Sequence, residues 1–386
     1  MKKLLTIALL SSALYAESYE HFLQRAVEQS PLLKASSLRI EQSTYKGDVL
    51  TRYENPNLEL EASYFTPDDT DNDMGYRASY SQPIRLWGIG DAKENLADAQ
   101  IALSKADYIQ AKATFVYKIS LQYTSYALNN LLMTLAKEEL ALASTIYAIS
   151  KERYDAGTIS RGVTLQAQVD LKMSEARIQS LALKRQRSYY TLLKDSGTSK
   201  EVLIDPDYTF TLETVEGTNP QLLQLENQLK SALADAELNS NDVEWMAISA
   251  EYEKEPDQDI YRIGASIPLA FFKTKEQEQQ IAKLEAKRSE MLTDNAQSKL
   301  TIELQRLRYE AKALANLQSI DEDILSGEQE LLAMYQDGYK IANINLLALQ
   351  DAKARLIETK ERLIRIKIEL DRNAIVQNYL QGNYND

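Results

Sequence analysis

The stretch "RYDAGTIS", Arg153 to Ser160, holds one of only 12 glycines in a chain of 386 residues. The run before it, residues 91–155, has no proline and is rich in Ala, Leu, Lys and Tyr. About 180 residues further on, "MYQDGYKIA", Met334 to Ala342, places the same Tyr-x-x-Gly pattern after a second run of this kind. A turn that occurs twice in the same setting indicates an internal repeat.

Other landmarks align at a similar spacing, and the offset between them falls slowly from 189 to 181 residues. The aligned pairs are Ser30-Pro31 with Asn219-Pro220, Tyr64 with Tyr252, Pro83 with Pro268, and Gly157 with Gly338. Beyond the glycines we expect the register to continue without gaps, so that Leu165, Ala167 and Asp170 match Leu346, Ala348 and Asp351. The sequence therefore predicts a first structural repeat over residues 17–218 and a second over residues 219–386.

Each repeat is expected to begin with a helix, near residues 19–50 and 220–239, followed by two short segments of period two. In "NLELEASYF", Leu58, Leu60 and Tyr64 alternate with Glu59 and Glu61, as in a strand with one apolar face. We predict strands over about 57–66 and 74–86, then 243–254 and 259–271. Long helical hairpins should follow over about 91–195, with its tip at 157, and 273–380, with its tip at 338.

The long helices carry few large apolar residues, so they cannot surround a single globular core. Each helix must instead bury its apolar stripe against neighbouring helices. Four strands cannot close a barrel, and an open sheet edge in lipid leaves backbone groups unpaired. Three copies supply 12 strands and close by cyclic symmetry. The predicted fold is mainly α with a small β part, and the strands of three copies form a shared 12-stranded outer-membrane barrel. Taken alone, the strands also fit a soluble hairpin domain.

The N-terminus has the pattern of an export signal. Lys2 and Lys3 precede an apolar run from residue 4 to residue 14, and "LYA" precedes Glu17. We predict a signal peptide over residues 1–16, with cleavage after Ala16; a buried N-terminal helix is the alternative. No other apolar run approaches the roughly 20 residues of a membrane-spanning helix.

Composition excludes several classes of function. A formal charge of −13 argues against nucleic-acid binding, which needs cationic side chains. The absence of cysteine and the presence of a single histidine, His21, argue against thiol or Ser-His catalysis and thiolate metal sites. The "WGIGDAK" segment lacks the third glycine and the strand pattern of a dinucleotide loop. We therefore expect no enzyme activity, no cofactor and no metal.

The order of elements, repeated twice after a signal peptide, resembles the TolC-type outer-membrane efflux family over nearly the whole mature chain. The resemblance rests on "NPQLLQLENQLKSALADAEL", on "YSQPIRL" with "ASIPLAF", and on "RYDAGTISRGVTLQAQVDL" with "MYQDGYKIANINLLALQDA". It implies a homotrimeric channel in the outer-membrane lipid of a Gram-negative bacterium. In that channel the β-barrel continues into a periplasmic α-helical barrel, and substrates are conducted passively. It also implies two partners: a periplasmic adaptor (membrane-fusion) protein and an inner-membrane pump, of the resistance-nodulation-division type.

The resemblance places the two glycine turns at the periplasmic tips, where an adaptor docks. We expect both glycines to take positive φ as helix C-caps. The expected docking residues are Arg153, Tyr154, Gly157, Thr158, Ile159, Ser160, Tyr335, Gly338, Tyr339 and Lys340. Tyr335 and Lys340 are also expected to help hold the tip closed.

Some family members have aspartates near the tip, but the corresponding positions here are Val163, Gln166, Ile344 and Leu347, which predicts an apolar or amide-lined constriction. Asp170 and Asp351 are candidates to face the lumen and favour cations; solvation of an outer groove is the alternative. A periplasmic adaptor or coiled-coil scaffold is the alternative function, although such proteins would not need two lipid-compatible strand pairs.

Overall fold

The computed structural model describes residues 16–66, 73–198, 201–213, 217–272 and 274–385. Apart from Ala16, the predicted signal peptide lies outside these residues, as does Lys273, the predicted first residue of the second helical hairpin. The chain forms two compact units. The first contains Met1–Lys34, Ala111–Asn219 and Leu300–Asp386, and the second contains Ala35–Gln110 and Pro220–Lys299.

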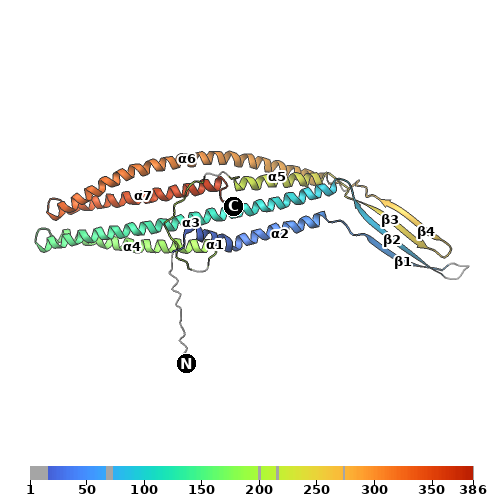
Figure 1. Cartoon of the computed structure of the whole chain (residues 1–386), viewed down its shortest axis with the longest axis horizontal. Coiled ribbons are helices and arrows are strands. Elements are labelled where there is room, and N and C mark those ends of the chain that lie inside the picture. Colours follow the sequence, from blue (N-terminus) through green and yellow to red (C-terminus); the bar gives the residue numbers. More distant parts are fainter. Residues whose placement is uncertain (1–15, 67–72, 199–200, 214–216, 273, 386) are drawn as a thin grey trace, which may run out of the picture. The chain divides into compact units, whose positions relative to one another are not determined.

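The described residues are mainly helical with one small sheet (Figure 1). In chain order the elements are α1 (Tyr19–Gln29), α2 (Pro31–Thr51), β1 (Asn57–Phe65), β2 (Asp73–Arg85), α3 (Ile89–Asp155), α4 (Arg161–Ser196), α5 (Pro220–Leu238), β3 (Trp245–Lys254), β4 (Asp259–Ser266), α6 (Glu276–Lys340) and α7 (Leu346–Leu380). Within the described ranges, no helix combines the length and the apolarity needed to cross a membrane.

The expected first helix over residues 19–50 is divided in two. α1 ends at Gln29 and α2 begins at Pro31, which has no N–H to continue the helical hydrogen bonds. The Ser30 hydroxyl accepts the backbone N–H of Leu33 at 3.4 Å and so caps the new helix. The proline in "QSPLL" is therefore the first residue of a second helix rather than part of a continuous one.

In the first unit, α3 with α4 and α6 with α7 make two helical hairpins whose turns lie at the same end (Figure 1). Gly157 has the predicted left-handed conformation, with φ of 74°. The N–H of Thr158 donates to the carbonyl of Arg153 at 2.8 Å, and the N–H of Gly157 donates to that of Tyr154 at 2.9 Å. This pair of bonds is the Schellman motif, which ends a helix by pairing its last carbonyls.

The same prediction for Gly338 is wrong. Gly338 lies inside α6, and the left-handed residue of the second turn is Ala342, with φ of 68°. Asn343 donates to the carbonyl of Gly338 at 2.9 Å and Ala342 to that of Tyr339 at 3.3 Å, so the same motif forms one helical turn later. A Cβ on Gly338 would lie 2.5 Å from Cγ1 of Ile344. A glycine is therefore needed at this position because Ile344 packs closely against it, and not because the backbone has positive φ.

The turn geometry also corrects the predicted register of the repeats. α4 has Ser160 as its N-cap, and α7 has Asn345, so the helices after the tips correspond at an offset of 185 rather than 181. Tyr154 then corresponds to Tyr339, and Asp170 corresponds to Arg355 instead of Asp351. The identical Tyr-x-x-Gly patterns mark similar settings but not equivalent positions.

A hydrophobic cluster joins the four helices of the two hairpins near the turns, and we call it the tip cluster. Its buried members come from α3, α4, α6 and α7, and Leu349 and Ile146 have no exposed surface. The buried residues are Ile146, Ala167, Leu332, Tyr339, Leu346, Leu349, Ala352 and Leu356. We expected the long helices to bury their apolar stripes on one another. This is confirmed here, because all four helices contribute residues to the cluster.

An extended segment, residues 201–213, lies across the first unit; we call it the strap. Three tyrosine hydroxyls hold its backbone: Tyr123 donates to the carbonyl of Asp205 at 2.7 Å, Tyr126 to that of Ile204, and Tyr189 to that of Val202. On the other side, the carboxylate of Asp371 in α7 accepts the N–H of Phe210 at 3.0 Å. Side chains of three helices thus pair four backbone groups of the strap.

The second unit contains a four-stranded antiparallel sheet in the order β1-β2-β3-β4. Its register pairs Leu58 with Tyr80, Tyr80 with Ala250, and Ala250 with Ile263, so the predicted apolar positions share one face. That face is exposed in the single chain; the exposed fraction of Ile263 is 89%. The predicted alternation is therefore present, although β4 ends at Ser266 instead of residue 271 and β3 begins at Trp245 instead of residue 243.

The opposite face of the sheet carries charges that pair across strands. Arg77 lies directly opposite Glu61, and their side chains meet at 2.5 Å. Arg262 lies opposite Glu251 and contacts both Glu251 and Glu253. Opposite charges at directly paired positions stabilise an antiparallel sheet and fix its register.

Arg85, the last residue of β2, ties the sheet to the helices of the second unit. Its guanidinium lies 4.6 Å from the ring centres of both Tyr53 and Trp245 and donates to the carbonyls of Thr51 and Arg52. Those carbonyls are at the end of α2, where a cation interacts favourably with the helix dipole. One buried side chain thus fixes the end of α2 against the start of β3.

The buried carboxyl of Asp371 makes the stability of the first unit depend on pH. Burial raises its pKa from 3.8 to about 6, although the N–H of Phe210 and the charge of Lys367 act in the opposite direction. A raised folded-state pKa gives stability that is present below about pH 4 and is lost as pH rises through about 6. We expect the free energy of unfolding to fall by about 1.4 kcal/mol between pH 5 and pH 8.

Asp371→Asn should remove most of this dependence, because an amide stays neutral and its oxygen still accepts the N–H of Phe210. Thermal unfolding of the full chain at pH 5 and pH 8 measures the effect. Asp207→Asn is the matched control, since that strap carboxylate is 82% exposed. The same pH dependence in Asp371→Asn as in the wild type would contradict the assignment.

Candidate functional site

Tyr339 joins the tips of the two helical hairpins in the first unit. Its ring is buried, with 1% of the residue exposed, and its hydroxyl lies 2.9 Å from the hydroxyl of Ser150 in α3. The guanidinium of Arg153, also in α3, donates to the carbonyl of Tyr339 at 2.8 Å and lies 4.7 Å from the ring centre. Two polar contacts and one cation–π contact therefore link the end of α6 to the end of α3.

The predicted docking residues differ in accessibility. Tyr154, Thr158, Ser160 and Lys340 are exposed, and Tyr154 has 43% of its surface accessible. Arg153 and Ile159 are half-buried, as are Tyr335 and Gly338. Tyr339 is the exception, since its buried side chain is used within the chain and offers no surface to a partner. The exposed members of the predicted docking set are therefore polar or aromatic, although Ile341 beside them is also 69% exposed.

Tyr335 and Lys340 do not have the same environment as each other. Tyr335 packs against the tip cluster. The ammonium of Lys340 pairs with Asp337 of its own helix at 2.9 Å, and both side chains are largely exposed. An exposed ion pair within one helix contributes little to the contact between helices.

The four residues predicted to form the constriction also have different environments. Val163 and Ile344 are half-buried against the tip cluster. Gln166 donates to the side-chain oxygen of Gln350 at 2.9 Å, and Leu347 is 68% exposed. An amide pair and an exposed leucine are therefore both present near the starts of α4 and α7.

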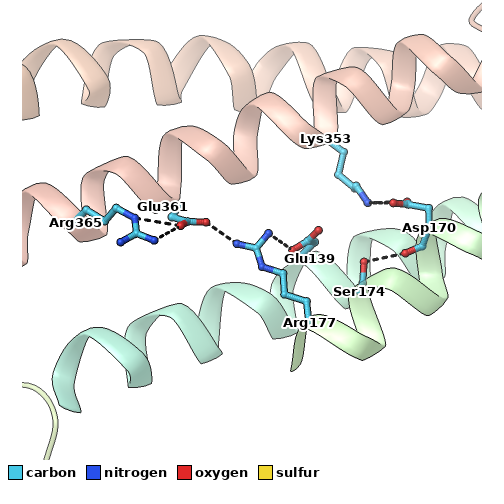
Figure 2. Close-up of polar contacts among 7 residues, drawn as sticks. All are labelled: Glu139, Asp170, Ser174, Arg177, Lys353, Glu361 and Arg365. Atoms are coloured by element: carbon cyan, nitrogen blue, oxygen red, sulfur yellow. Dashed lines mark hydrogen bonds and ion pairs between the residues drawn. The ribbon is translucent and has the colours of Figure 1, made fainter. Parts of the chain in front are cut away.

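A ladder of polar contacts connects α4 with α7, and we call it the inter-hairpin ladder. Beyond the Gln166–Gln350 bond, Lys353 donates to both oxygens of Asp170 at 2.8 and 2.6 Å. Arg177 then pairs with Glu361 at 2.5 Å (Figure 2). The contacts join residues 183 or 184 positions apart, as expected of two parallel helices in a constant register.

The Arg177 end of the ladder is a network rather than a single pair. Figure 2 shows its guanidinium between Glu361 and Glu139 of α3, which lies 3.0 Å away. Arg365 contacts the other oxygen of Glu361 at 2.6 Å. Burial acts to raise the pKa of Glu361, but the guanidiniums of Arg365 and Arg177 outweigh it, so the pKa is lowered. Glu361 therefore stays ionised and keeps both arginines in place.

A groove of about 670 Å³ follows the ladder between α4 and α7. Its lining is mainly polar and includes residues from the ladder together with Leu347 and Met173. Among the lining residues the carboxylates are Glu139, Asp170, Asp351, Glu358 and Glu361, and the cations are Arg177 and Lys353. The lining of the groove therefore has a net negative charge, because its carboxylates outnumber its two cationic side chains.

Asp170 and Asp351 both have cationic partners. Asp170 pairs with Lys353, whose side chain is only 4% exposed. Asp351 pairs with Arg355 one turn along its own helix, where both side chains are exposed. Because Asp170 corresponds to Arg355 in the repeat, the two aspartates are not equivalent positions, and the predicted symmetry between them is wrong.

Sequence reasoning missed Ser150, Arg177 and Lys353. Lys353 had a detectable signal, because it lies within the stripe formed by Leu349, Ala352 and Leu356, where a lysine needs a partner. Neither Ser150 nor Arg177 interrupts a pattern in this way. Within the described part of the chain, no group of three or more His, Cys, Asp or Glu side chains could hold a metal ion.

Residues 22–198 match the profile of the outer membrane efflux protein family. This segment belongs to the outer membrane efflux protein family. It contains α3, α4 and the first turn, so the predicted family is confirmed over the first of the two repeats. None of the curated proteins matches the chain in sequence.

Solved structures extend the likeness of the fold to most of the chain. The outer-membrane channel OprN aligns with a TM-score of 0.78 and 14% identity, over 95% of this chain and 90% of that one. VceC from Vibrio cholerae gives 0.77 and 14%, over 94% and 95%, and CmeC from Campylobacter jejuni gives 0.71 and 13%, over 94% and 85%. The mainly helical fold with one small sheet is thus the fold of these channels.

The match over residues 22–198 and the fold shared with these channels agree with the expected role, the channel component of an outer-membrane efflux system, and with the expected location in the outer membrane. The alternative of an adaptor or scaffold protein has no support. The efflux family is a transport family rather than an enzyme family.

Proposed function

We propose that three copies of this chain form a closed channel, with a shared barrel of 12 strands and a cylinder of helices. The main support for this proposal is the four-stranded sheet of the second unit. Among the described strands, β1 pairs only with β2, and β4 pairs only with β3. One face is apolar and exposed, while the other has charged residues. Such a sheet is compatible with lipid only when its edges are paired, which adjacent copies achieve by joining β4 to β1.

The helices support assembly in the same way. In the first unit, α4 exposes Leu165, Val169 and Met173 at intervals of four residues, which places them on one face. α6 exposes a second apolar set that includes Tyr309 and Ile320. Exposed stripes on long helices are typical of surfaces that other helices cover, and neighbouring copies are the occupants that a symmetric trimer supplies.

Within this proposal, the channel conducts passively and works with a periplasmic adaptor and an inner-membrane pump of the resistance-nodulation-division type. The exposed tip residues Tyr154, Thr158, Ser160 and Lys340 form the adaptor surface. The link from Tyr339 to Ser150 and Arg153 holds the tips in the resting state. Opening then requires α6 to separate from α3 at this point.

The native mass of the mature protein, extracted from outer membranes in mild detergent, tests the assembly. We expect a trimer, because a single chain leaves two sheet edges unpaired. Carbonate washing of the membranes is the control, and the protein should remain in the pellet. A water-soluble monomer would remove the barrel and the channel with it.

Arg153→Ala should raise the resting conductance of the reconstituted channel, because it removes both the hydrogen bond to the Tyr339 carbonyl and the contact with the ring. A loss of about 1.4 kcal/mol would increase the open population about tenfold. Planar bilayer recordings measure this. Lys340→Ala, which removes an exposed pair within α6, is the matched control, and an equal increase in the two variants would argue against the Tyr339 link.

The lumen-facing role of Asp170 and Asp351 stays a prediction. Replacing both by Asn should shift the reversal potential in a salt gradient toward zero if their charges favour cations. Glu285→Gln, which changes an exposed carboxylate in α6, is the control for a general charge effect. An unchanged cation preference in a trimeric double variant would show that the two aspartates serve only the contacts between helices.

A further inference from the structure

A cavity of about 540 Å³ lies in the first unit, away from the tips and the inter-hairpin groove. It is bounded by α1, by the strap, by residues 112 and 116 of α3 and by residues 378–384 at the end of the chain. We call it the strap cavity. Its volume lies within the range of about 300–1,000 Å³ that is typical of small-molecule sites, and neither the family match nor the proposed channel function gives it a role.

Aromatic rings form one wall of the strap cavity. The ring centres of Tyr19 and Tyr208 lie 4.6 Å apart, and Phe210 lies 4.9 Å from each of them. Tyr384 also lines the cavity. Aromatic faces carry negative potential and attract a cation placed within about 6 Å of the ring centre. This wall thus provides apolar surface and favours positive charge at the same time.

Carboxylates border the same rings. The cavity is lined by Glu20, Glu28 and Glu213, and its one cationic lining residue is Lys112. The Tyr208 hydroxyl donates to Glu20 at 3.4 Å. Burial raises the pKa of that hydroxyl, and the charges of Glu20 and Glu213 raise it further, as expected with both carboxylates close to the ring. The formal charge of the lining is negative.

The amide side chains that line the cavity are already hydrogen-bonded within the chain. Asn378 accepts the N–H of Glu213 at 2.9 Å and donates to the carbonyl of Thr211 at 2.8 Å. Asn383 donates to the side-chain oxygen of Asn378 at 3.1 Å. These amides hold the strap against α7, so the groups left to recognise a ligand are the rings and the carboxylates. Rings and carboxylates together select charge and apolar surface rather than a pattern of hydrogen bonds.

We propose that the strap cavity binds a small hydrophobic organic cation of the aryl quaternary-ammonium class. The ammonium lies against the rings of Tyr208 and Phe210 beside Glu20 and Glu213, and the aryl group fills the apolar part of the cavity near Leu23 and Val27. Such a ligand needs no hydrogen-bond donor or acceptor. It joins the strap to α1 and stabilises the folded first unit by mass action. This site does not depend on the trimer or on conduction.

The test is calorimetric titration of the full-length mature protein, in nonionic detergent, with benzyltrimethylammonium. We expect a dissociation constant of about 1 mM or below, as is usual for a ligand of this size. Benzyl alcohol and benzenesulfonate are the neutral and anionic comparison ligands, and both should bind at least tenfold more weakly. Equal binding of the neutral compound would overturn the role of charge and, with it, the proposal.

Variants locate the site. Tyr208→Leu should weaken binding of benzyltrimethylammonium about tenfold, and Tyr309→Leu, which changes an exposed tyrosine of α6, should leave it unchanged. Because Tyr208 is half-buried, Glu20→Gln combined with Glu213→Gln serves as the second variant; both side chains are exposed, so the fold is retained. This double variant should also weaken binding about tenfold. Unchanged binding in it, or equal losses in Tyr309→Leu, would refute the site.

Discussion

The two Schellman turns determine how the helices of the first unit meet. Each turn is closed by a pair of backbone bonds, and the outer bond of the pair runs from Thr158 to Arg153 in the first hairpin and from Asn343 to Gly338 in the second. These bonds set the first residues of α4 and α7, and hence every later contact between the two helices. Had the second turn formed one helical turn earlier, at Gly338, Lys353 would no longer lie opposite Asp170. The contacts of the inter-hairpin ladder are a consequence of where the chain reverses.

The ladder gives specificity more than net stability. The Asp170–Lys353 pair is largely removed from water, and desolvation offsets much of the attraction between its charges. Removing one partner, in contrast, leaves the other buried and unpaired, which costs about 3–5 kcal/mol. Two parallel helices with similar apolar stripes can slide by a turn at little loss of packing, but not past such a pair. The polar contacts therefore select one register among several with similar hydrophobic burial.

The sheet has the opposite arrangement of surfaces from a soluble domain. Its apolar face is open to the surroundings, and its charged face pairs Arg77 with Glu61 and Arg262 with Glu251. The edges of β1 and β4 have no partner among the described strands, and the proposed assembly rests on these edges together with the apolar face. The tyrosine bonds of the strap and the Arg85 contacts satisfy polar groups within each unit, so the surfaces that remain for the proposed assembly are the strand edges and the exposed helix stripes.

The sequence by itself determined the order of elements, the alternation of the strands, the glycine turn at Gly157 and the family. These follow from local rules: a period of two, long runs without proline, and glycine at positive φ. Only the tertiary structure decided that the second turn forms at Ala342, that Tyr339 is buried, and that Lys353 meets Asp170. The reason is helical geometry, because a shift of four residues rotates a helix by only about 40° and leaves its apolar stripe almost unchanged. Offsets of 181 and 185 thus fit the pattern nearly equally well, and contacts between residues more than 180 positions apart select one.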